Sequence, residues 1–310
     1  KGQNTNINGL FNGKSISTNL RNISFTHFEK TTDNKILLDG LEVTGHQLKL
    51  GDNNSSLSVA EYNIADNKSS SFRQLVYKTN NGKTNADVSI PSLTLTPHIQ
   101  PLLDGNIALD AIAMMKPIIN LHLTTKKRED ITKKTKLPDI DISELKLVQP
   151  KIRFTQTSDS GTLSLDWQGQ KNNSGFLLVN DLHTTNDVTL ASSLKFFLTD
   201  FTFTNSKGKM FNTGEGKVAA QLKDISLEQS ALRPLQWKAI VSGFDALDFH
   251  MDSIGKSKGT LVMNSVSLNN LNISSSSIKD FQQLAAVNSM FQIKKFTGNY
   301  TTGGTNLQWY

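Results

Sequence analysis

The sequence predicts a mainly β protein, an elongated and twisted antiparallel sheet of repeated strand units that form a groove or an incomplete barrel. Apolar and polar residues alternate through most of the 310 residues, and such alternation places one set of side chains on each face of a pleated strand. Turn signals such as Asn8-Gly9, Asn12-Gly13 and Asn81-Gly82 separate the alternating stretches at hairpin spacing. We therefore expect a sheet with one apolar face and one polar face.

A spaced pattern of apolar residues recurs along the chain. Its clearest copy reads Ile112-x-Met114-x-x-Pro117-x-Ile119-x-Leu121-x-Leu123. A second copy has its proline 33 positions later and reads Leu145-x-Leu147-x-x-Pro150-x-Ile152-x-Phe154. Looser copies without proline read Leu41-x-Val43-x-x-His46-x-Leu48-x-Leu50 and Val266-x-Leu268-x-x-Leu271-x-Ile273. The repeat favours a stacked β architecture and predicts that Pro117 and Pro150 occupy matching strand starts or bulges.

The stretch from Pro97 to Leu121 resembles the AsmA-like proteins, which belong to the bridge-like, repeating β-groove lipid-transfer proteins of bacterial envelopes. The matching residues are Pro97, Pro101, Leu102, Leu103, Gly105, Ile107, Leu109, Ile112, Pro117, Ile119 and Leu121. This resemblance implies a non-enzymatic protein of the periplasm or cell envelope that binds or conducts lipid acyl chains and supports outer-membrane lipid homeostasis or assembly. It also implies that a single inner-membrane anchor precedes Lys1 in the full-length protein.

The apolar positions of the two proline-marked units are the predicted lipid-contacting surface. They are Ile112, Met114, Ile119, Leu121, Leu145, Leu147, Ile152 and Phe154. The expected partner is a phospholipid or another acyl-chain lipid, and the resemblance adds a membrane surface reached through the anchor. The alternative is a structural or adhesive cell-surface protein whose apolar faces close on each other as an ordinary core, with no lipid ligand. The sequence leaves both alternatives open.

Composition narrows the chemistry that the chain can perform. The absence of cysteine excludes disulfides and cysteine-based metal or nucleophile chemistry. A net charge of +6 favours mild attraction to anionic surfaces and argues against a nucleic-acid partner. No run approaches the roughly 18 apolar residues of a membrane-spanning helix. We expect no cofactor.

Two constellations of polar residues are weak candidates for a chemical site. Alternation would place the three side chains of Asp248-x-His250-x-Asp252 on one strand face, where they could bind a metal ion. Asp139, Asp141 and Glu144 could act as the acid and base of a glycosidase-like site. For both spacings we favour an ordinary solvent-facing strand over a chemical site. We therefore predict neither a catalytic nor a metal site, and a carbohydrate-active enzyme is the least favoured function.

Three regions and one helix complete the predicted organisation. Residues 1–123 form an N-terminal β region, residues 124–136 a basic flexible loop, and residues 137–310 a C-terminal β region. The loop either faces anionic lipid headgroups or, as we favour, is a solvated connector. A short amphipathic helix is predicted over Ser277–Phe291, because a capping box precedes apolar residues spaced three or four apart. Packing of this helix on the sheet is favoured over a position on a membrane surface.

We expect trypsin to cut the native protein first within Thr124–Lys136. This segment has almost no apolar residues, so burial cannot offset the ~1–2 kcal/mol per residue that ordering costs. Mass spectrometry of the early fragments locates the cut. Resistance at Lys126, Lys127 and Lys133 would contradict the prediction.

Overall fold

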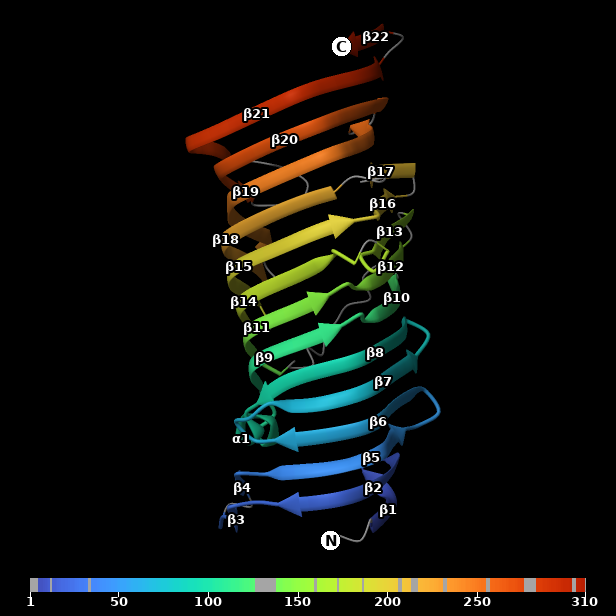
Figure 1. The fold of residues 1–310 in the computed structure, drawn as a ribbon, viewed down its shortest axis with the longest axis vertical. Coiled ribbons are helices and arrows are strands. Elements are labelled where there is room, and N and C mark those ends of the chain that lie inside the picture. The colour runs from blue at the N-terminus through green and yellow to red at the C-terminus, as the bar shows by residue number, and fades with distance from the viewer. Residues whose placement is uncertain are drawn as a thin grey trace.

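The fold is a long stack of strands with the N-terminus at one end and the C-terminus at the other (Figure 1). The computed structural model describes residues 5–11, 13–32, 35–125, 138–158, 161–171, 173–185, 187–205, 208–212, 217–230, 233–254, 257–275, 283–302 and 305–309. These residues form one sheet of 20 strands, a separate two-stranded hairpin and the short helix α1 (Ile99–Leu103). The predicted mainly β character is confirmed.

The strands follow one another along the chain. The first half contains β1 (Thr5–Phe11), β2 (Lys14–Ser24), β3 (His27–Lys30), β4 (Ile36–Asp39), β5 (Glu42–Gly51), β6 (Ser55–Ala65), β7 (Ser70–Asn80), β8 (Thr84–Pro97), β9 (Ile107–Met115), β10 (Ile118–Thr125) and β11 (Ile140–Val148). The second half contains β12 (Lys151–Ser158), β13 (Gly161–Gln168), β14 (Phe176–Thr184), β15 (Val188–Thr199), β16 (Phe201–Asn205), β17 (Gly208–Asn212), β18 (Lys217–Ser230), β19 (Arg233–Ile254), β20 (Ser257–Ser275), β21 (Gln283–Thr302) and β22 (Thr305–Trp309).

The large sheet is mostly antiparallel and is not closed. From one end it runs β1, β2, β5, β6, β7 and β8. The long strand β8 then pairs with both β9 and β10, and two branches follow. One branch is β9, β11, β14, β15 and β18, and the other is β10, β12, β13, β16 and β17. Both branches meet β19, which leads to β20, β21 and β22.

Two pairs of neighbours are parallel, which the prediction of an antiparallel sheet did not include. β9 pairs with β11 and β10 pairs with β12, each in parallel register. After the end of β10 the chain therefore returns to the start of β9, where β11 begins. Parallel neighbours need a connection of a dozen or more residues, and the chain between Thr125 and Ile140 supplies it. The predicted flexible loop falls on this connection, and residues 126–137 lie outside the described part of the chain.

A line of residues in the left-handed conformation crosses the sheet where its strands bend. Gln47 in β5 and Gln74 in β7 have φ angles of 56° and 51°. Lys116, between β9 and β10, and Gln149, between β11 and β12, have φ angles of 50° and 52°. β5, β7, β9 and β11 run in the same direction, and the four residues lie at equivalent register positions, each two residues after the position paired across the sheet. We call this line the corner.

The two prolines of the repeat follow directly after corner residues, as predicted. Pro117 and Pro150 are both less than 2% exposed, and the parallel registers on either side of the corner place them next to each other. The Lys116 N–H donates to the Val148 carbonyl, and the Lys151 N–H donates to the Pro117 carbonyl, both at 2.8 Å. The ladder therefore continues across the corner without the N–H that proline lacks.

The copy of the repeat in β5 is displaced by two residues from the prediction. The corner residue of β5 is Gln47, so Leu48 occupies the position of Pro117 and Gly45 that of Met114. The prediction had placed His46 at the position of Pro117. The apolar spacing was misaligned because glycine, and not an apolar side chain, occupies the position of Met114. Glycine is required at Gly45 because a Cβ atom would overlap the hydroxyl of Tyr62.

The predicted helix over Ser277–Phe291 is wrong for its described part. Residues 276–282 lie outside the described part of the chain, and strand β21 begins at Gln283. Leu284 pairs with Ile273 and Ala286 with Leu271 in antiparallel register with β20. The edge of a long sheet offers backbone partners along its whole length, and this tertiary context overrides a weak helical propensity.

We expect Lys116→Val to lower the free energy of unfolding by about 1–3 kcal/mol, because a β-branched residue is strained at positive φ. Lys146→Val, on an exposed residue of β11 where strand conformation favours valine, is the matched control and should cost nothing. Urea denaturation of the two variants measures the difference. Equal stabilities would show that the corner does not need its left-handed residue.

Candidate functional site

One face of the sheet carries an unbroken row of apolar residues across ten strands. Residues directly opposite each other on neighbouring strands share a face, and the registers link nine apolar side chains and one glycine in this way. The row is Leu20, Gly45, Tyr62, Phe72, Leu93, Met114, Leu147, Leu177, Phe196 and Ala220. We call it the central apolar row and its face of the sheet the inner face. In backbone register the row continues through Phe244, Leu268 and Phe291.

The structure brings all eight predicted lipid-contacting residues together as four cross-strand pairs. Met114 and Leu147 pair within the central apolar row, and Ile112 and Leu145 pair two residues before them. Beyond the corner, Ile119 pairs with Ile152 and Leu121 pairs with Phe154. Seven of the eight side chains are half-buried, and Leu147 is buried.

The corner explains how the inner face stays apolar while the strands bend. Side chains alternate between faces with period two, but Met114 and Pro117 are three residues apart. Met115 and Lys116, the two residues between them, are both exposed. The extra residue at the corner therefore shifts the alternation by one, so that Pro117 and Ile119 return to the inner face.

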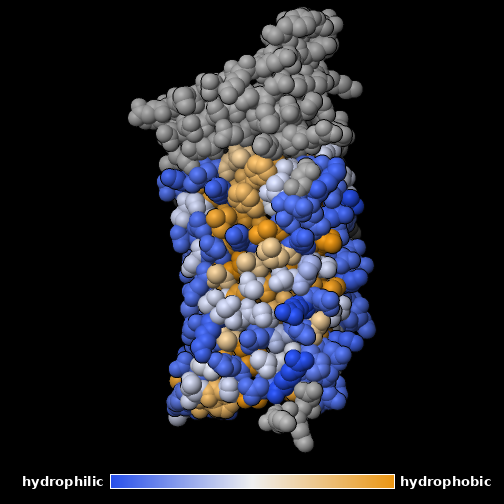
Figure 2. All heavy atoms as spheres, in the orientation of Figure 1, coloured by the Kyte–Doolittle hydropathy of each residue, from blue (hydrophilic) through white to orange (hydrophobic). Residues whose placement is uncertain are grey.

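The opposite face of the same strands is mostly polar. The residues that alternate with the central apolar row follow one another in register as Asn22, Thr44, Asn63, Ser71, Thr94, Ala113, Lys146, Leu178, Lys195 and Gln221. Figure 2 shows apolar side chains gathered in a band along the long axis, with hydrophilic side chains on both sides. The two faces thus differ in the way that the alternation predicted.

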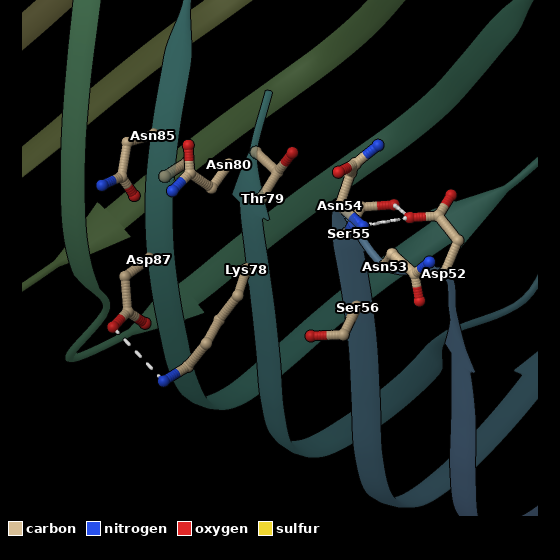
Figure 3. A pocket seen from close by; sticks show the side chains of 11 residues that line it. Asp52, Asn53, Asn54, Ser55, Ser56, Lys78, Thr79, Asn80, Asn85 and Asp87 are labelled. Atoms are coloured by element: carbon tan, nitrogen blue, oxygen red, sulfur yellow. Dashed lines mark hydrogen bonds and ion pairs between the residues drawn. The ribbon is translucent and has the colours of Figure 1, made fainter. Parts of the chain in front are cut away.

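Burial on the inner face comes from the curvature of the sheet. Val59 is 2% exposed and Trp167 is 4% exposed, yet the described residues include neither a second large sheet nor a helix that could cover them. A flat single-layer sheet would leave such side chains open to water. The sheet therefore curves around its inner face, as the bent strands in Figure 3 also indicate.

Polar groups on the inner face are few. Thr18 Oγ1 and Tyr62 Oη share a buried hydrogen bond of 2.8 Å, which provides the phenol with a partner. The indole N–H of Trp167 is buried without a partner in the described part of the chain. Its immediate neighbours in register are Ile152 and Phe201, so its surroundings are those of an apolar wall.

The weaker polar candidates are not brought together into a site. Asp141 and Glu144 are exposed along β11, and Asp139 precedes this strand with its carbonyl bonded to the Ile107 N–H. The Asp248-x-His250-x-Asp252 motif lies in β19, where only the backbone is described. Within the described part of the chain, no three His, Asp or Glu side chains are grouped to hold a metal ion. No helix of that part is long and apolar enough to cross a membrane.

A polar pocket of about 290 Å³ lies where the β5–β6 and β7–β8 turns meet (Figure 3). It is lined by Asp52, Asn53, Asn54, Ser55, Ser56, Lys78, Thr79, Asn80, Asn85, Ala86 and Asp87. Lys14 lies 3.6 Å from Asp52, and Lys78 lies 3.5 Å from Asp87. Both carboxylates are thus balanced by lysines, and the pocket offers no charge that would recruit a metal ion or an acidic ligand.

Asp52 in this pocket acts as a turn-forming group. Its Oδ1 accepts hydrogen bonds from the backbone N–H groups of Asn54 at 2.8 Å and Ser55 at 2.7 Å. These bonds, that of Asn54 first, hold the pKa of Asp52 below its ordinary value of 3.8, and Lys14 adds to the effect. The arrangement is an Asx turn that closes the β5–β6 hairpin.

No protein-family model matches the chain, and no curated protein matches it. The inner face is therefore identified as the candidate site from its geometry alone.

We expect the turn at Asp52 to loosen only in acid. Because its pKa is lowered in the folded state, the stabilisation is complete above the unfolded pKa and is lost as pH falls through the folded pKa. The amide signals of Asn54 and Ser55 should therefore shift in NMR spectra with a midpoint below 3.8. Asp52→Asn is the control and should abolish this titration, whereas a midpoint at or above 3.8 would contradict the assignment.

Proposed function

We propose that the inner face is a groove that binds or conducts the acyl chains of phospholipids, with no catalytic step. The observation that carries the proposal is the central apolar row, because a continuous apolar surface is the physical requirement for holding an acyl chain in water. Each methylene transferred from water contributes about 0.8 kcal/mol. A continuous apolar row allows every methylene of a bound acyl chain to make this contribution. Side chains of a single row also serve any chain length.

The length of the row supports conduction as well as binding. Ten neighbouring strands at about 4.8 Å spacing extend over roughly 43 Å. The hydrocarbon core of a bilayer is about 30 Å thick, so the acyl chains of one leaflet occupy about 15 Å. The row therefore exceeds one acyl chain more than twofold, which favours several lipids in line over a single enclosed ligand.

Partial exposure of the inner face also favours a ligand. Met114, Ile119 and Leu145 are half-buried although they lie in the middle of the apolar face. An ordinary closed core would bury such residues almost fully. Acyl chains lying on these side chains would remove their remaining apolar surface from water.

The resemblance to AsmA-like proteins at Pro97–Leu121 supports the same function and also implies where in the cell the protein works. On this proposal the protein works in the periplasm or cell envelope, next to an inner membrane in which the full-length protein is anchored. Its role is the supply of lipid for outer-membrane homeostasis or assembly.

We expect phospholipid to co-purify with the chain and to contact the inner face specifically. The chain has no cysteine, so single cysteines can carry a photo-crosslinker at Met114 and Leu147. Ala113 and Lys146 are matched controls, since they are the preceding residues and lie on the opposite face. Mass spectrometry should detect lipid adducts at the first two positions and not at the controls. Equal labelling at all four positions, or no extractable lipid, would overturn the proposal.

A charge on the inner face separates a groove from a closed core. In a groove, Met114→Asp stays partly hydrated, so the protein remains folded while its lipid content falls. In a closed core the buried, unpaired carboxylate would lower the free energy of unfolding by about 3 kcal/mol or more. Ala113→Asp is the control for both measurements. A Met114→Asp variant that unfolds, from a parent without lipid, would leave the structural or adhesive role.

A further inference from the structure

A second apolar surface lies outside the inner face, on the end of β2, the β3–β4 hairpin that follows it and the neighbouring α1. It comprises seven of the 13 large hydrophobic side chains that are exposed in the described part of the chain. They are Ile23, Phe25, Phe28, Ile36, Leu37, Leu102 and Leu103. We call them the hairpin patch. Figure 1 shows β3, β4 and α1 together at one side of the sheet, near its N-terminal end.

The hairpin patch is held in place by specific hydrogen bonds. Gln100 of α1 donates from Nε2 to the Ile36 carbonyl and accepts at Oε1 from the Leu38 N–H, both at 3.1 Å. The buried carboxylate of Asp66 accepts from the Ile99 N–H at 2.9 Å and from the Gly40 N–H at 3.3 Å. An isolated two-stranded hairpin is marginally stable in water, so these bonds fix an element that would otherwise not persist.

The same bonds restrict what can bind. Gln100 occupies a carbonyl and an N–H of β4, so a partner cannot add a strand at these positions. Ile36 and Leu37 are consecutive strand residues and both are exposed, so apolar side chains project from both faces of the hairpin. A folded protein would cover one face, whereas lipid can surround apolar side chains on both faces of the hairpin strands.

Charge gives no preference for an anionic partner. Lys30 and Lys35 of the hairpin are outnumbered by Glu29, Asp33 and Asp39, and His27 lies 3.4 Å from Glu29. Phe25 and Phe28, 52% and 55% exposed, are in contact with a ring separation of 5.8 Å. The patch therefore offers apolar and aromatic surface without an excess of positive charge, which suits the boundary between headgroups and acyl chains of a neutral membrane.

We propose that the hairpin patch inserts into the surface of a lipid membrane and docks this end of the protein there. The patch lies beside the large sheet, because α1 follows Pro97 of β8 and Pro97 pairs with Leu109 of β9. Docking would therefore set this side of the sheet against the membrane. The inference goes beyond the proposed lipid groove and stands on different residues, so either can fail alone.

Flotation of the full chain with phosphatidylcholine vesicles tests the inference. The double variant Phe25→Ser, Phe28→Ser should bind at least about tenfold more weakly, because each buried phenylalanine contributes a factor of about ten to association. Met115→Ser, Leu190→Ser is the matched control, since both residues are exposed and apolar but lie outside the patch. Circular dichroism confirms the fold of each variant. Binding should not fall with added salt.

A fluorescent probe locates the contact. An environment-sensitive label on Phe28→Cys should shift to the blue with vesicles, and one on Leu190→Cys should not. Failure of the parent to float, or equal flotation of the two double variants, would overturn the inference. A label shift that depends on protein concentration and not on vesicles would overturn it in favour of a second copy. Unchanged extractable lipid in the patch variant, beside lost flotation, would support docking as a property separate from the groove.

Discussion

The fold depends on keeping one face apolar where its strands bend at the corner. Strand side chains alternate with period two, so one extra residue in extended conformation would move all later apolar side chains of the strand to the polar face. At the corner the alternation slips by one residue, and Gln47, Gln74, Lys116 and Gln149 absorb it in the left-handed conformation. Because the slip occurs at the same register position in these strands, their inner-face residues remain neighbours on both sides of the bend.

The corner also accounts for features that look unrelated in the sequence. Pro117 and Pro150 are tolerated inside long strands because the ladder at the corner does not use their missing N–H groups. Where the chain crosses from β13 to β14, Gly169 and Gly175 pass so closely that a Cβ on either would meet backbone. Proline, glycine and the polar corner residues thus serve one geometric requirement, a sheet that bends sharply without losing its pairing.

The sequence predicted the faces of the sheet better than its connections. Alternation and the proline-marked repeat were enough to place Ile112, Met114, Leu145 and Leu147 on one face, because such patterns are local. The parallel pairing of β9 with β11 depends on where a long connection returns, which no local pattern encodes. Most of the central apolar row, including Leu93, Leu177 and Phe196, was also missed as a row, because register between strands is set by tertiary structure. The helix predicted at Ser277–Phe291 failed for the same reason, since an amphipathic spacing says nothing about a sheet edge nearby.

The two apolar surfaces differ in shape, and this difference narrows what can bind both. The inner face is concave and its side chains are fixed by the backbone ladder, whereas the hairpin patch projects from the side of the sheet. A folded partner would have to be complementary to each surface separately, since shape complementarity at protein interfaces approaches that of protein interiors. Acyl chains are fluid and adapt to both shapes, and association with them is favoured by apolar area alone. On the two proposals, a hydrocarbon ligand accounts for the concave and the projecting surface through a single physical property.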